Sequence, residues 1–248
     1  MSGRRLMWVV AMLLGATTAL AGPLWAARGS EDDDGPHGRG SHGTRRYNGW
    51  GALFALPRRE FKDITGNGIG LEAQSSGALD GRGILRIHSD VSLLYHLRRD
   101  HDVPTGQLAP GDQLALGTSA SMFHVLIGPE LSMPAGGQRL YVFGTAGYGT
   151  AWVRQELSGH INGGAEDYDL QVSRQSNMFA WSAGGGVRIA HGNGSWIDLS
   201  AEFRDALGAK MITTSEVSTA GAVVSYGQRS VDMGQLVFRL AFARSPGL

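Results

Sequence analysis

Hydrophobic and polar positions alternate with a period of two along most of this chain. The clearest stretch is residues 83–97, in which Leu85 and Ile87 alternate with Arg86 and His88. This alternation is typical of a β-strand with one apolar and one polar face. Eight such segments predict an all-β fold. They cover residues 47–57, 67–79, 83–97, 121–133, 139–157, 177–190, 195–206 and 231–243.

The connections between the eight segments alternate in length. The short ones are residues 80–82, 134–138 and 191–194, and the long ones are 58–66, 98–120, 158–176 and 207–230. Successive connections of an up-and-down barrel lie at opposite rims, and membrane barrels have short periplasmic turns and longer external loops. The sequence therefore predicts an eight-stranded antiparallel up-and-down transmembrane β-barrel over residues 47–243. The longest external loops are expected after the third, fifth and seventh strands.

The first 46 residues have a different character. Arg4 and Arg5 precede an apolar run, and Ala19-Leu20-Ala21 follows a small-x-small cleavage pattern. These features predict a signal peptide over residues 1–21, with cleavage there or as late as residue 27. Residues 28–46 are polar, charged and rich in glycine, which predicts a disordered linker. No later stretch is apolar for long enough to form a transmembrane helix, so only a closed barrel would allow the mature chain to span a membrane.

Four stretches of the chain resemble a known family. They are GILRIHSDVSLLYHL, VLIGPELSMP followed by LYVFGTAGYG, FAWSAGGGVRIAHG with WIDLSAEFR, and the closing LVFRLAFA. On these stretches, residues 47–243 resemble the small bacterial outer-membrane β-barrel domain family, akin to the OmpA transmembrane domain and OmpX. The resemblance implies an eight-stranded barrel in the bacterial outer membrane. The chain departs from the family pattern at its end, where ARSPGL follows Phe242 instead of a terminal aromatic residue.

Charge and cysteine content exclude several classes of function. Lys and Arg total 22, as do Asp and Glu, so the formal net charge is zero. A nucleic-acid-binding protein needs a basic surface to offset phosphates, so no nucleic-acid partner is expected. The chain has no cysteine, which excludes thiolate metal sites and cysteine nucleophiles. No spacing of metal ligands or cofactor motif is present, and no cofactor is expected.

The polar faces of the predicted strands carry charges of both signs and several histidines. An eight-stranded barrel has room inside for little beyond its own side chains, and buried charges must be paired. We therefore expect a structural ion-pair network in the lumen, in preference to a charged pore or a metal or acid-base site. Its predicted members are Glu72, Arg86, His88, Asp90, His124, Glu130, Arg188, Asp198, Glu202, Arg204 and Arg239.

The sequence predicts no catalytic, cofactor-binding or metal-binding residue. We expect a monomeric outer-membrane barrel of structural or surface-interaction type, surrounded by outer-membrane lipid. Any external ligand is expected at the loops, because loops on a rigid scaffold often carry function. The most polar predicted loop cluster consists of His160, Glu166, Asp167, Tyr168 and Asp169.

Two alternatives remain open at this stage. The first is a barrel enzyme that acts on outer-membrane lipid, with Ser92, His96 and Ser121 as candidates near the long-loop rim. The second is a soluble lipocalin-like envelope carrier. Its apolar face would line a cavity and its charges would face water, so the two orientations of the barrel wall distinguish it from a membrane barrel.

Overall fold

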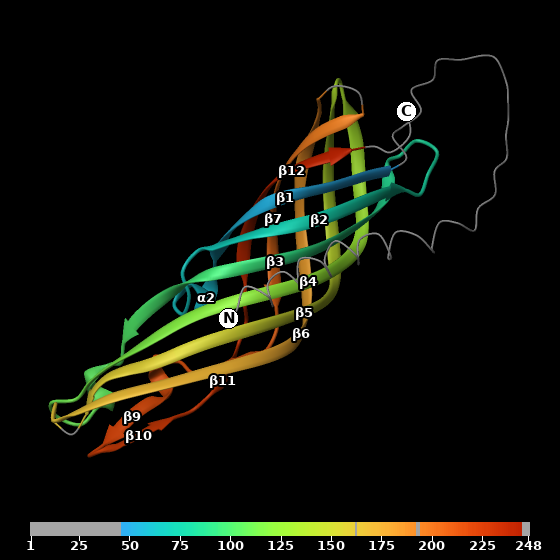
Figure 1. Ribbon diagram of the computed structural model, residues 1–248. Coiled ribbons are helices and arrows are strands. Elements are labelled where there is room, and N and C mark those ends of the chain that lie inside the picture. Colours follow the sequence, from blue (N-terminus) through green and yellow to red (C-terminus); the bar gives the residue numbers. More distant parts are fainter. Residues whose placement is uncertain (1–45, 162, 192–193, 245–248) are drawn as a thin grey trace, which may run out of the picture.

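The chain folds into a closed barrel of antiparallel strands. The computed structural model describes residues 46–161, 163–191 and 194–244 (Figure 1). Around the barrel the strand order is β1-β12-β7-β6-β5-β4-β3-β2, so neighbours in sequence are neighbours in space. The predicted eight-stranded up-and-down barrel is therefore confirmed. Its strands are β1 (Arg46–Pro57), β2 (Gly68–Ala78), β3 (Leu85–Asp102), β4 (Gln113–Ala135), β5 (Gln138–Ile161), β6 (Glu166–Ala190), β7 (Ser195–Ala206) and β12 (Gln235–Arg244).

The N-terminal predictions fall almost entirely outside this part of the chain. The predicted signal peptide and residues 28–45 of the predicted linker lie outside the described residues. Arg46, which we assigned to the linker, is the first residue of β1. Within the described ranges, no helix has the length and apolar character needed to cross a membrane.

Strands β4 and β6 are much longer than the sequence predicted, and β3 and β5 also continue beyond their predicted ends. The predicted loop 98–120 is reduced to residues 103–112, and the predicted loop 158–176 is reduced to residues 162–165. The expectation of long loops after the third and fifth strands was therefore wrong. The His160–Asp169 cluster lies at the strand ends of a hairpin and not in a long loop. The longest connection is the one after β7, residues 207–234, and it contains several short elements of its own.

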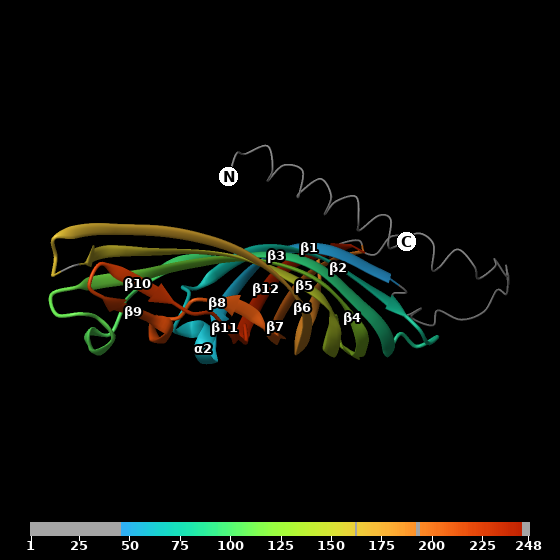
Figure 2. The same cartoon turned by 90° about the horizontal axis from the view of Figure 1, so that it is seen from below.

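The short elements are found in three connections. They are α2 (Arg59–Lys62), the 3-10 turns Thr105–Gln107 and Thr214–Glu216, and strands β8 (Ala209–Met211), β9 (Val217–Ala220), β10 (Val223–Tyr226) and β11 (Arg229–Val231). Strand β8 pairs with β11, and β9 pairs with β10. Residues 207–234, called the cover segment below, thus form two small sheets beside the long strands (Figures 1 and 2).

Strands β3 to β6 continue beyond the barrel as an open four-stranded sheet. Strand β2 pairs with β3 only as far as His96, and β7 pairs with β6 only from Ala180 onward. We call the remaining parts of the four strands, residues 97–120 and 151–179, the extension (Figure 1). The cover segment packs against one face of it. The buried cluster between them consists of Val103, Leu114, Leu116, Leu157, Ile161, Ile212 and Val217.

The outside of the barrel is apolar. Leu71, Ile127 and Phe179 are 60%, 57% and 57% exposed. Trp50 and Phe242 lie beside each other near the short-turn rim, with ring centroids 6.2 Å apart and ring planes tilted by 46°. The charged face points inward, where these side chains are buried. This is the arrangement of a barrel that spans a membrane, and it contradicts the lipocalin-like alternative, whose apolar face would point inward.

Candidate functional site

The lumen brings all of the predicted polar residues together. Each of the eleven is nearly inaccessible to water, and the most exposed, Arg239, is only 6% exposed. Side chains with so little contact with solvent leave no water-filled path beside them. The polar lumen is continued toward the long-loop rim by an apolar layer that includes Leu53, Leu94 and Met122, and Phe61 of α2 belongs to the same cluster.

Glu130 is the centre of one half of the network. Its two carboxylate oxygens accept hydrogen bonds from the guanidinium of Arg188 at 2.6 and 2.8 Å. His88 Nδ1 lies 3.0 Å away and Arg86 Nε 3.3 Å away. Ser76 adds a hydrogen bond of 3.1 Å. Charge-assisted, bidentate contacts of this kind are among the strongest that a protein makes.

Glu72 is the centre of the other half. It pairs with Arg239 and, at 3.1 Å, with Arg204. Arg204 also contacts Glu202 at 2.5 Å and Asp90 at 3.5 Å. The two halves meet at Asp198, because Arg188 lies 3.0 Å from it and Arg239 lies 3.7 Å from it.

Tyr141 belongs to this network although the sequence analysis did not identify it. Its hydroxyl donates to Asp198 Oδ1 at 2.5 Å and accepts from Arg239 at 2.8 Å. The guanidinium of Arg188 lies 4.0 Å from the centre of its ring. A usable signal was present, since Arg139 and Tyr141 are two residues apart and so share a face of the strand. The glycines of this segment concealed the alternation.

The candidates for lipid-modifying catalysis are not brought together. Ser92 and His96 are four residues apart on β3, about 13 Å along the strand. Ser92 Oγ accepts from Arg204 at 2.5 Å, whereas His96 contacts Gln235 and the carbonyl of Gly66. Ser121 pairs with the exposed Tyr95 on the outer face. Among the described residues, no group of three or more His, Asp or Glu side chains is placed to hold a metal ion.

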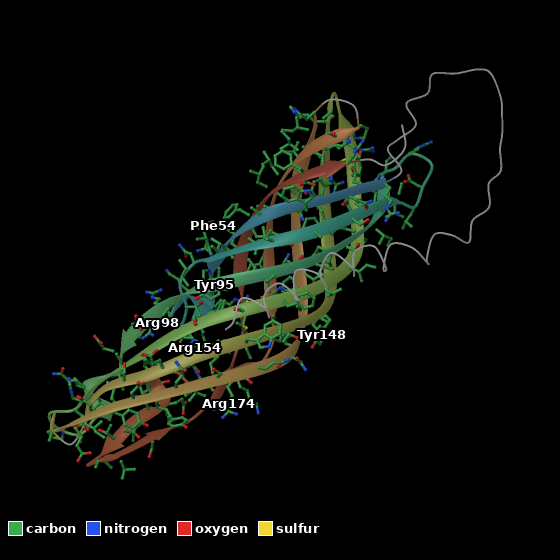
Figure 3. The ribbon with its side chains drawn as sticks, in the orientation of Figure 1. Phe54, Tyr95, Arg98, Tyr148, Arg154 and Arg174 are labelled. Atoms are coloured by element: carbon green, nitrogen blue, oxygen red, sulfur yellow. The ribbon has the colours of Figure 1, made fainter. Side chains whose placement is uncertain are left out.

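The extension presents a polar outer face and a free edge. Arg98 lies 2.7 Å from both Asp100 and Glu156, and these hydrogen bonds raise the pKa of Arg98 above its usual range. Arg98, Arg154 and Arg174 mark the stretch between barrel and tip (Figure 3). Along Asp167–Gln175, strand β6 pairs with β5 on one side, and no backbone partner on its other side is found within the described ranges.

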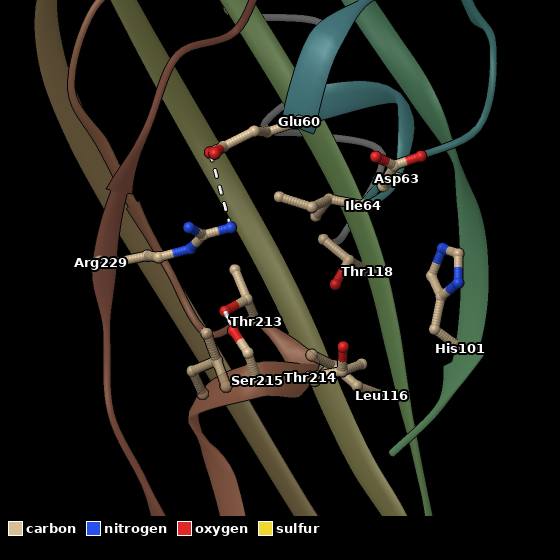
Figure 4. Close-up of a pocket in the computed structure, with 11 residues that line it drawn as sticks. Glu60, Asp63, Ile64, His101, Leu116, Thr118, Thr213, Thr214, Ser215 and Arg229 are labelled. Atoms are coloured by element: carbon tan, nitrogen blue, oxygen red, sulfur yellow. Dashed lines mark hydrogen bonds and ion pairs between the residues drawn. The ribbon is translucent and has the colours of Figure 1, made fainter. Parts of the chain in front are cut away.

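A cavity lies where the extension meets α2 and the cover segment. Its volume is about 120 Å³. An ion pair of 3.5 Å joins Glu60 and Arg229 across it, and Asp63, His101 and Thr118 lie around it (Figure 4). The remaining lining residues are Ile64, Leu116, Ile212, Thr213, Thr214 and Ser215.

Comparison with known proteins gives only distant similarities. No family model and no curated protein matches the sequence. Among solved structures, Ail, the attachment invasion locus protein of Yersinia pestis, is 11% identical with a TM-score of 0.42, covering 82% of this chain and 98% of that one. A major outer membrane protein from Thermus thermophilus is 10% identical with a TM-score of 0.46, covering 80% and 98%. Neisserial surface protein A is 13% identical with a TM-score of 0.36, covering 81% and 96%. None of these three similarities reaches a TM-score of 0.5.

Proposed function

We propose that this protein is a structural, surface-interaction barrel of the bacterial outer membrane that binds an extended strand of another protein at the edge of its extension. The observation that carries the proposal is the free side of β6 over Asp167–Gln175. An unpaired strand edge offers a row of backbone donors and acceptors to an incoming strand. The role requires no catalysis, and the dispersed positions of Ser92, His96 and Ser121 support that.

The membrane partner in this proposal is lipid. The apolar side chains around the barrel match a hydrocarbon environment, and a closed barrel leaves no strand edge inside it. The barrel therefore needs no second copy to complete it, and we propose a monomer. The extension begins at the rim with the longer connections, which supports an external position for it.

The residues of the β6 edge define the chemistry of the incoming strand. Asp167 and Asp169 share one face of β6, whereas Tyr168, Leu170 and Val172 lie on the face that packs toward the cover segment. Complementary cross-strand pairs stabilise a sheet. The best partner is therefore an extended segment in which basic and apolar residues alternate.

The test uses synthetic peptides and the full chain in detergent micelles. The probe is a peptide of alternating lysine and valine with the length of Asp167–Gln175, and its control is the same peptide fully N-methylated. Hydrogen exchange of the β6 amides reports the pairing. We expect the probe to slow exchange along Asp167–Gln175 and the methylated peptide to leave it unchanged, because methylation removes every backbone donor.

Variants separate strand addition from general charge attraction. Asp169→Lys places a like charge opposite the lysines of the probe and should weaken binding several-fold. Asp102→Lys makes the same change at the far edge of the extension, on β3, and should have little effect. Equal protection by both peptides, or equal loss in both variants, would contradict binding at the β6 edge.

A further inference from the structure

The cavity between α2, β3, β4 and the cover segment has the features of a small-molecule site. Three separate parts of the chain supply its walls: Glu60 to Ile64 after β1, His101 to Thr118 across β3 and β4, and Ile212 to Arg229 from the cover segment. The barrel network described above includes none of these residues. The cavity is also separate from the β6 edge, so it is a second candidate site on the external side of the molecule.

The lining combines the hydroxyl groups of threonine and serine with apolar side chains. Thr118 and Thr213 are buried, and Thr213 Oγ1 lies 2.9 Å from Ser215 Oγ. Ile64 and Ile212 supply buried apolar walls. Thr118 Oγ1 accepts a hydrogen bond of 3.1 Å from Gln155, which leaves its own hydrogen available to donate.

His101 adds an unsatisfied polar atom to this wall. Its Nε2 is buried and has no hydrogen-bond partner among the described residues. A buried polar atom without a partner costs roughly 1–3 kcal/mol. A hydroxylated ligand in the adjacent cavity supplies such a partner.

The charges around the cavity disfavour an anion. Glu60 is neutralised by its ion pair with Arg229, which leaves the carboxylate of Asp63 as the excess charge among the lining residues. Carboxylates accept hydrogen bonds from neutral hydroxyls and repel another carboxylate or a phosphate. The site therefore suits a neutral ligand that is rich in hydroxyl groups.

The volume limits the size of that ligand. A water molecule needs about 10–15 Å³ of such volume, so 120 Å³ accommodates roughly ten atoms of similar size. This is the size of one sugar ring and not of an oligosaccharide chain. From the hydroxyl lining, the charge and the volume together, we propose that this cavity binds a single neutral sugar unit, either as a free monosaccharide or as the terminal unit of a surface glycan.

The test follows methyl groups of the full chain in detergent micelles by NMR. Ile64 and Ile212 line the cavity, and the lipid-facing Ile127 serves as an internal control. The probes are D-glucose, D-galactose, D-mannose and the anionic D-glucuronate. We expect at least one neutral sugar to shift the Ile64 and Ile212 signals saturably, without affecting Ile127, and to bind at least tenfold more tightly than glucuronate.

Matched variants assign the binding to the cavity. Thr118→Val keeps the shape and removes one hydroxyl, so we expect about fivefold weaker binding. Ser119→Val makes a similar change at the next residue, which faces the opposite side of β4, and should bind like the unaltered protein. Asp63→Asn removes the excess negative charge. It should therefore reduce the ratio between the affinity for the neutral sugar and the affinity for glucuronate.

Three results would overturn the proposal. The first is the lack of a saturable shift at Ile64 and Ile212 with all three neutral sugars. The second is glucuronate binding as tightly as the neutral sugars. The third is normal sugar binding by a folded Thr118→Val variant, which would mean that the sugar does not bind in this cavity. A methyl glycoside distinguishes the two sources of the sugar. If the ligand is the terminal unit of a glycan, the methyl glycoside must bind as tightly as the free sugar. None of these measurements depends on strand addition at β6.

Discussion

Glu130 illustrates how individual side chains stabilise the interior of the barrel. It is fully buried and accepts two hydrogen bonds from Arg188. We predict that Arg188→Met lowers the free energy of unfolding by about 3–5 kcal/mol, because Glu130 and Asp198 both lose a close cation. Urea unfolding in lipid vesicles, followed by tryptophan fluorescence, measures the change.

Arg154→Met is the control for this prediction. Arg154 is an exposed residue on the outer face of the extension, so the same chemical change there should alter the free energy of unfolding by less than about 0.5 kcal/mol. Similar losses in the two variants would mean that the lumenal pairing is not the cause.

Gly186 makes room for the tyrosine of the network. A Cβ atom at this position would lie 2.4 Å from the carbonyl oxygen of Leu199 and 2.7 Å from both Tyr141 Oη and Ser200 Cβ. We predict that Gly186→Leu destabilises the barrel by about 1–3 kcal/mol through overpacking, as measured by the same unfolding assay. Gly137→Ala is the control, since no atom lies within 4 Å of its added Cβ. A stable Gly186→Leu variant would show that the backbone at Leu199 and the Tyr141 side chain can both shift without cost.

For single residues, the sequence predicted whether a side chain faces the lumen or the lipid. It did not predict the residue with which that side chain pairs. Apolar neighbours such as Leu85 and Ile87 identify Arg86 as inward-facing. The pairing of Glu72 with Arg239 joins residues 167 positions apart. It depends on how the strands are staggered around the barrel, and alternation carries no information about that stagger.

The extension has a core of its own, which is separate from the barrel lumen. Leu157 is buried between β5 and the cover segment. We predict that Leu157→Ala loosens the extension by about 2–5 kcal/mol and leaves the barrel folded. Limited proteolysis should then remove residues of the extension while the remaining fragment still migrates as a folded barrel on an unheated gel.

Val223→Ala is the matched control for this element, because Val223 is exposed on β10. It should resist proteolysis as well as the unaltered protein does. If Leu157→Ala instead unfolded the whole barrel, the extension and the barrel would form one cooperative unit.

The true length of β3 to β6 was hidden because the surroundings of these strands change along their course. In the lipid-facing part, the outward residues are apolar and the alternation is plain. In the extension the outward residues are polar, as with Glu156 and Gln171 beside Leu157 and Leu170. The inward partners belong to the cover segment, more than fifty residues away in sequence in the case of Leu157 and Ile212. Polar composition therefore led us to predict loops.

Buried side chains fill the interior of the barrel. The polar lumen, the apolar layer at Leu94 and Met122, and Phe61 of α2 follow one another inside the barrel. We predict that the folded protein produces no steady ion current in a planar bilayer, because its buried side chains leave no water-filled path. Discrete, porin-like current steps from the purified protein would contradict this. Different migration of unheated and boiled samples on a gel confirms that the tested protein is folded.

The continuity of β3 to β6 also determines how the molecule responds to force. Each of these strands continues from the barrel wall into the extension, with one register shift between β3 and β4 at His96/Arg99, and no loop separates the two parts. A load applied to the tip along the strands acts on many ladder hydrogen bonds in shear at the same time, instead of unzipping them one by one. A partner bound at the β6 edge, as proposed above, would therefore pull on the barrel wall through the strands themselves and not through a flexible loop.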